Sequence, residues 1–168
     1  SEAREVADDG LHTYWVPQIF GHDALTVLAL VGREVPGIEL GTAVVPTFPR
    51  HPMMLAQQAL TVQAATGGRL ALGIGLSHQI VVEFMWGMSF AKPVRHLREY
   101  LEVLVPLLEG KPVAHQGEAY QVNGAVNVGG GSRPSVLVAA LGSQMLRVTG
   151  ALADGTSTWC VEIGRAHV

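Results

Sequence analysis

Short apolar runs alternate with amphipathic segments along most of this chain. The run 38–45 is apolar and β-branched at most positions and ends at Pro46, and the run 69–75 follows a Gly-Gly pair. The segment 52–65 between them places four small or apolar side chains on one helical stripe: Leu55, Ala59, Val62 and Ala65. A strand, a helix and a second strand form a βαβ unit, for which parallel pairing and a right-handed crossover are the default.

The same alternation continues on both sides of this unit. It predicts a helix at the start of the chain, strands at 11–16, 136–140 and 156–159, and helices at 24–32, 80–86, 93–109 and 141–153. The alternating segment 113–126 contains two turn signals, Gly117-Glu118 and Asn123-Gly124, and predicts a β-hairpin excursion. About five parallel strands result, which fit either a doubly wound sheet or part of an eight-stranded barrel. A whole barrel takes about 250 residues, more than the 168 present.

Residues that follow the predicted strands are the candidate ligand contacts, because ligands of parallel α/β folds collect at the carboxyl ends of the strands. His78 follows the strand at 69–75 and could move a proton near neutral pH. A solvated loop histidine is the alternative. Leu141, Gly142 and Ser143 open a helix after a buried strand, where free N–H groups can hold a phosphate. An ordinary helix cap by Ser143 is the alternative there.

Composition narrows the possible partners and setting. A formal net charge of -3 and a pI near 6.1 give no basic footprint for nucleic acid. The mean hydropathy is +0.29, yet no apolar run approaches the roughly 20 residues of a membrane-spanning helix. A single cysteine, Cys160, fits a reducing, cytoplasmic setting. Four histidines lack metal-ligand spacing, which predicts caps and surface positions rather than a metal site: His22, His51, His96 and His115.

Four stretches carry a resemblance to a known family: GTAVVPTFPRHP, LAQQALTVQAATGGRLALGIGLSH, KPVRHLREYLEVLVPLLEGKPV and LADGT. Together they resemble the luciferase-like monooxygenase superfamily, especially its coenzyme F420-dependent oxidoreductases. The resemblance implies an incomplete TIM (β/α)8 barrel with a β-hairpin insertion, in which the first strand precedes Ser1 and the last two follow Trp159. Residues 1–161 are then a partial barrel domain. The remainder, 162–168, reads EIGRAHV and is similar to a translated sequencing adapter, so we expect it to carry no biology.

The resemblance also implies which residues hold the cofactor, coenzyme F420 or alternatively FMN. Ala43 and Val44 match the position of a non-proline cis peptide that backs the cofactor ring, whereas residue types alone favour plain strand core. Gly75, Leu76 and Ser77 end the next strand at the same ligand face, where glycine lets a planar ring or a polar head approach the backbone closely. The turn 141–143 matches the phosphate site. His78 stands where related enzymes can carry an acidic catalytic residue.

Gln18 marks a departure from one branch of the family. The sugar-phosphate dehydrogenase relatives carry an Asp-His pair in this region, whereas this chain has Gln18-Ile19. The amide of Gln18 can still hydrogen-bond the polar edge of the ring, whereas the absence of the histidine argues against sugar-phosphate dehydrogenase chemistry.

Taken with these residues, the resemblance implies an oxidoreductase that passes a hydride between the deazaflavin and a small organic substrate. An FMN-dependent luciferase-like monooxygenase is the alternative within enzymes. A non-catalytic truncated fragment is the alternative of another class, because an unclosed barrel leaves strand edges unpaired. A homodimer is a further expectation for the full-length parent.

Overall fold

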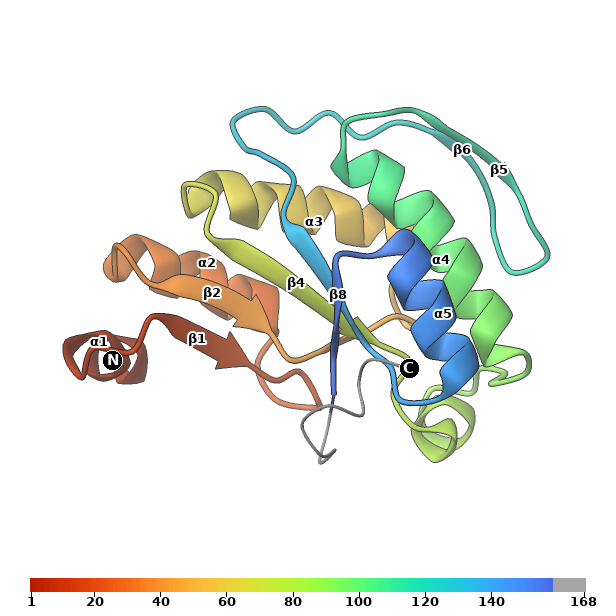
Figure 1. The fold of residues 1–168 in the computed structure, drawn as a ribbon, viewed down its shortest axis with the longest axis horizontal. Helices are drawn as coiled ribbons and strands as arrows, with labels where there is room; N and C mark the ends of the chain where they lie inside the picture. Colours follow the sequence, from red (N-terminus) through yellow and green to blue (C-terminus); the bar gives the residue numbers. More distant parts are fainter. Residues whose placement is uncertain (159–168) are drawn as a thin grey trace.

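The computed structural model describes residues 1–158, which form one open parallel sheet with helices packed against it (Figure 1). Five strands lie in the order β1, β2, β4, β7, β8, and every pairing between them is parallel. Their bounds are Thr13–Val16, Glu39–Thr42, Leu70–Gly75, Ser135–Ala139 and Gly155–Ser157. The sequence predicted this count and direction. Within the described residues the sheet stays open, with β1 and β8 at its edges.

Helices follow the strands as predicted and form a layer along the sheet. Their bounds are α1 Glu2–Asp8, α2 Ala24–Glu34, α3 Pro52–Ala65, α4 Pro93–Leu108 and α5 Ser143–Leu152. In Figure 1, α2, α3, α4 and α5 lie one after another along this layer, each in contact with the next. They cover one face of the sheet, on which alternate strand residues are almost fully buried: Leu40, Leu72, Ile74, Val136 and Val138.

The helix α3 differs from its predicted pattern in two positions. Leu55, Ala59 and Val62 are buried as expected, but Ala65 is exposed. Gln63 takes a buried place instead, because its Oε1 accepts a hydrogen bond of 2.8 Å from the backbone N–H of Leu70 at the start of β4. A polar side chain on the buried face thus fixes where the next strand begins.

The strand predicted at 38–45 is divided. It forms β2 and, after a break, the two-residue β3 (Val45–Pro46), which pairs with the end of β4. The peptide bond between Ala43 and Val44 is cis, at the position that the family resemblance implied. The break turns the chain so that Val44 crosses toward β4.

Two segments depart from regular α-helix and parallel sheet. The predicted helix at 80–86 is the π-helix η1, Val81–Met85. The predicted hairpin is present as β5 (Val113–Gln116) paired antiparallel with β6 (Gln121–Gly124), and it lies beside α4 (Figure 1). No helix among residues 1–158 is long and apolar enough to cross a membrane. The end of the strand predicted at 156–159 and the adapter-like residues 162–168 lie outside the described part.

Candidate active site at the carboxyl edge of the sheet

Three strand ends meet at the carboxyl edge of the sheet. Gly75 ends β4, and a Cβ atom placed on it would lie 2.6 Å from Val44 Cγ2 and 3.2 Å from the Cβ of Ala139, which ends β7. Only glycine therefore fits between these neighbours. The structure brings together the predicted residues Ala43, Val44 and Gly75, although they come from two different strands.

Hydrogen bonds between neighbouring strands hold this edge in place. Thr42 Oγ1 accepts from the Gly73 N–H at 2.8 Å and donates to the Gly73 carbonyl at 2.7 Å. The N–H of Ala43 donates to the carbonyl of Val16 at the end of β1, at 3.0 Å. Because Thr42 is fully buried, this pairing is shielded from water. The backbone on both sides of the cis peptide is thus fixed by β1 and β4.

Gln18 lies just beyond β1 at the same edge, but part of its polar group is already engaged. Its Oε1 accepts a hydrogen bond of 3.1 Å from the N–H of Ala24, the first residue of α2. Asp23 caps the same helix by accepting from the Thr26 N–H at 2.9 Å. The amide N–H groups of Gln18 are left for a ligand.

His78 lies in an exposed turn after β4. Leu76 and Ser77 are half-buried, and Ser77 has a left-handed backbone with φ of 66°. The His78 carbonyl accepts from the N–H groups of Val81 and Val82, at 2.9 and 3.0 Å, so the residue precedes η1 directly. The side chain is therefore anchored through its backbone while its ring stays accessible.

The start of α5 is open. Gly142 is the N-cap residue, not Ser143 as the simple capping alternative had it, and no side chain caps this helix. A Cβ placed on Gly142 would meet no atom within 4 Å. Leu141, Gly142 and Ser143 are all exposed. The first N–H groups of α5 are thus free to take an anion, which is what a phosphate site needs.

Large apolar side chains gather in the loops of this edge. Six of them are more than half exposed and follow β1, β4 or β7: Ile19, Phe20, Ile80, Phe84, Met85 and Leu141. Exposed apolar side chains thus follow the same strand ends as the polar groups. Such a combination suits an organic ligand with few hydrogen-bonding groups.

One histidine is placed differently from the sequence prediction. His96 was expected at the surface but is 8% exposed, and its Nε2 lies 3.0 Å from Thr47 Oγ1. Its ring stacks on Phe48 with the centroids 3.9 Å apart. Burial lowers the pKa of His96 to about 4, against the opposing effect of Glu99. The spacing of four to Tyr100 and Leu104, both buried, was the available signal for an inward position.

The other three histidines agree only in part with the expectation of caps and surface positions. His51 is exposed and caps α3, with Nδ1 accepting from the Met53 N–H at 3.3 Å. His22 is exposed. His115 is half-buried on the hairpin, 3.7 Å from Glu99 and 3.8 Å from Glu102, so it is not a plain surface residue. Among residues 1–158 no group of three or more His, Cys, Asp or Glu side chains is arranged to hold a metal ion.

A buried carboxylate ties the hairpin to α4. Glu99 accepts hydrogen bonds from the backbone N–H groups of Glu118, Ala119 and Tyr120, at 3.2, 2.7 and 2.9 Å. Burial alone would raise the pKa of Glu99, but these hydrogen bonds bring it below its usual value. Arg95 also forms an ion pair with Glu118, so it is not simply solvated. The hairpin turn is thereby held against the first half of α4.

We expect Glu99→Gln to lower the free energy of unfolding by roughly 3 kcal/mol. The three backbone N–H groups lose their charged acceptor, and the new carboxamide N–H group faces these donors. Glu102→Gln on the same helix is the matched control. Glu102 accepts no backbone hydrogen bond and is partly exposed, so its change should stay below about 1 kcal/mol. Urea unfolding of both variants measures the difference. Equal losses would mean that Glu99 does not hold the hairpin.

Comparison with known proteins identifies the family. Residues 2–167 match the family model described as luciferase-like monooxygenase. Because this match covers nearly the whole chain, the protein belongs to that family. The parallel sheet and its helices correspond to the TIM-barrel architecture of solved luciferase-like structures, as the sequence predicted.

Similar proteins include reductases. The chain is 33% identical over 153 residues to a 5,10-methylenetetrahydromethanopterin reductase of Archaeoglobus fulgidus, covering 88% of this chain and 45% of the relative. It is 30% identical over 152 residues to the phthiodiolone/phenolphthiodiolone dimycocerosates ketoreductase of Mycobacterium bovis, covering 86% of this chain and 40% of the relative. The coenzyme F420-dependent tetrahydromethanopterin reductase of Methanopyrus kandleri has a similar structure, with a TM-score of 0.77 at 25% identity over 94% of this chain and 50% of that one. The chain thus spans about half the length of the relatives it matches.

Proposed function

We propose that the complete protein is a coenzyme F420-dependent oxidoreductase that passes a hydride between the deazaflavin C5 and a small organic substrate. The observation that carries the proposal is that Val44, the Gly75 strand end and, after the neighbouring strand β7, the uncapped start of α5 lie at one edge of the sheet. The single cysteine supports a reducing, cytoplasmic setting.

The residues of this edge fit a cofactor with a flat ring and a phosphate. Ala43 is exposed and Val44 is half-buried beside Gly75, so a flat ring can lie against this stretch of the edge. The N–H groups at the start of α5 suit the phosphate, and the Gln18 amide suits the polar edge of the ring. A deazaflavin bound here would supply the hydride chemistry. His78 would then hold or release the proton that balances charge on the substrate.

The reductases among the relatives support hydride transfer as the reaction. One solved relative depends on coenzyme F420 and another relative is a ketoreductase. An FMN-dependent monooxygenase is the second candidate, since the family model itself is described by that activity. Titration of the complete protein with each cofactor, followed by absorbance and fluorescence, separates the two.

The phosphate assignment gives a sharp test. We expect Gly142→Val to weaken deazaflavin binding by about tenfold or more, because a branched side chain would obstruct approach to the open helix start. Gly150→Val is the matched control, as Gly150 lies in the same helix, is exposed and has no atom within 4 Å of an added Cβ. Cofactor titration measures both. Unchanged affinity in Gly142→Val, or an equal loss in Gly150→Val, would contradict the assignment.

A further inference from the structure

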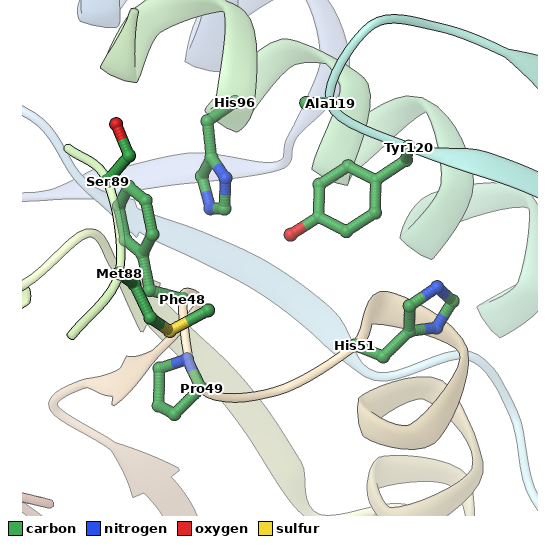
Figure 2. Close-up of a pocket in the computed structure, with 8 residues that line it drawn as sticks. All are labelled: Phe48, Pro49, His51, Met88, Ser89, His96, Ala119 and Tyr120. Atoms are coloured by element: carbon green, nitrogen blue, oxygen red, sulfur yellow. The ribbon is translucent and has the colours of Figure 1, made fainter. Parts of the chain in front are cut away.

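A second concave site lies beside the candidate cofactor edge. It is a pocket of about 400 Å³ between the segment after β3, the loop after η1, the start of α4 and the hairpin turn. Figure 2 shows its lining, which includes Phe48, His51, Met88, His96 and Tyr120. None of its lining residues belongs to the set proposed above to hold the cofactor. The volume lies within the usual range of small-molecule pockets, roughly 300 to 1,000 Å³.

The aromatic wall of the pocket is preformed. Phe48 is stacked between two rings, that of His96 at 3.9 Å and that of Phe90 at 5.4 Å between centroids. Thr47 fixes this stack, because its hydroxyl pairs with His96 while its N–H donates to the Gly75 carbonyl at 2.9 Å. The wall is therefore connected to the β4 strand end and does not need a ligand to assemble.

The opposite wall is held just as firmly. The backbone of Ala119 and Tyr120 is bonded to the Glu99 carboxylate, which fixes the hairpin turn over α4. The Tyr120 ring lies edge-on to those of His51 and Tyr100, at 5.7 and 5.8 Å. The Tyr120 ring also lies 5.5 Å from that of His96, tilted by 52°, so the aromatic side chains of the two walls are packed against one another.

The Tyr120 hydroxyl is one polar group of the lining, beside the Ser89 hydroxyl and the His51 and His96 rings. Figure 2 shows the Tyr120 hydroxyl pointing into the space between the labelled side chains, and within residues 1–158 no group hydrogen-bonds to it. Burial, and next the Glu99 charge, hold the pKa of Tyr120 well above its usual value, so this group is a hydrogen-bond donor at any physiological pH. His96 beside it is neutral there, since burial lowers its pKa to about 4. No Asp, Glu, Lys or Arg side chain lines the pocket.

We propose that this pocket binds a neutral, largely apolar carbonyl compound, whose apolar part lies against the aromatic lining and whose carbonyl oxygen accepts a hydrogen bond from the Tyr120 hydroxyl. A charged ligand would find no counter-charge among the lining side chains. An aromatic hydrocarbon would leave the Tyr120 donor without a partner, which weakens binding. The ligand proposed for this pocket is distinct from the cofactor proposed above.

Two probes of one skeleton test the proposal: 1-tetralone, which has the carbonyl, and tetralin, which lacks it. In calorimetric or NMR titrations the purified chain should bind 1-tetralone saturably and about three- to tenfold more tightly than tetralin. Tyr120→Phe should abolish this preference while leaving tetralin binding unchanged. Tyr14→Phe, in which a hydroxyl bonded to Glu2 is lost, should keep the preference.

Several outcomes would overturn the proposal. Equal binding of the two probes by the wild-type chain would do so without any variant, and so would the absence of saturable binding. A preference that survives Tyr120→Phe, with thermal unfolding unchanged, would show that the donor lies elsewhere. Displacement of 1-tetralone by coenzyme F420 or FMN would assign the pocket to the cofactor itself. Failure of these cofactors to bind at all leaves the probe measurements valid, so the two proposals fail separately.

Discussion

His78→Ala in the complete protein is expected to lower turnover by about 10²-fold, the low end of what general acid–base catalysis contributes. Hydride transfer leaves charge on the substrate that a proton must balance, and His78 stands at the β4 strand end with an exposed ring. Cofactor affinity should change much less, because the neighbouring ring and phosphate contacts remain. Steady-state kinetics from pH 5 to 9, together with a cofactor titration, measure both effects.

The control for this variant is His12→Ala. His12 is also exposed but precedes β1, at the opposite edge of the sheet, so its loss should leave turnover unchanged. Wild-type turnover for His78→Ala across the pH range would make His78 an ordinary loop residue, with proton transfer left to water or another group. A loss confined to cofactor binding would make it a contact of the ring instead.

Acid is expected to destabilise the protein through His96 by about 3 kcal/mol between pH 6.5 and pH 4. Burial lowers the pKa of His96 from the ordinary 6.5 to about 4, and the Glu99 charge only partly opposes this. Between these values the unfolded chain binds the proton and the folded one does not, so the free energy of unfolding falls as the pH falls. The neutral His96 contributes its full stabilisation above pH 6.5, and the size of this stabilisation follows from the difference between the two pKa values.

His96→Phe isolates this effect, since phenylalanine keeps a ring against Phe48 but does not titrate. The variant loses the bond to Thr47 and should be less stable at pH 7, yet its stability should vary little between pH 6.5 and 4.5. The carboxylates with lowered pKa values, Glu99, Asp23 and Asp154, are present in both proteins and act at lower pH. Urea unfolding at several pH values decides: parallel curves for wild type and variant would show that His96 does not titrate in this way.

Local patterns were enough to predict most of the elements. The α3 helix has the predicted bounds, and the βαβ unit, the hairpin and the parallel direction of the strands are all as expected. These features depend on periodicity, glycine and proline, which act over a few residues. The candidate residues Ala43, Gly75 and Gly142 were likewise placed at strand ends from local pattern and family resemblance. Their meeting at one edge follows from the parallel topology.

Features that depend on distant partners were decided by the tertiary structure. Gln63 is buried because Leu70 supplies its hydrogen-bond partner, and His96 is buried because Thr47 and Phe48 come from a different βα unit. Glu99 becomes a tether only when the hairpin turn, some 20 residues later, folds back onto α4.

Locally encoded features and features that depend on distant partners differ for a physical reason. Local propensity and apolar periodicity were enough to specify which segments form strands and helices, and hence the edge at which a ligand would bind. Which polar side chains are buried, which pKa values move, and where a second pocket opens depend on the packing of α4 against the hairpin and the segment after β3. Packing joins residues that no periodicity relates, so only the folded chain specifies those groups.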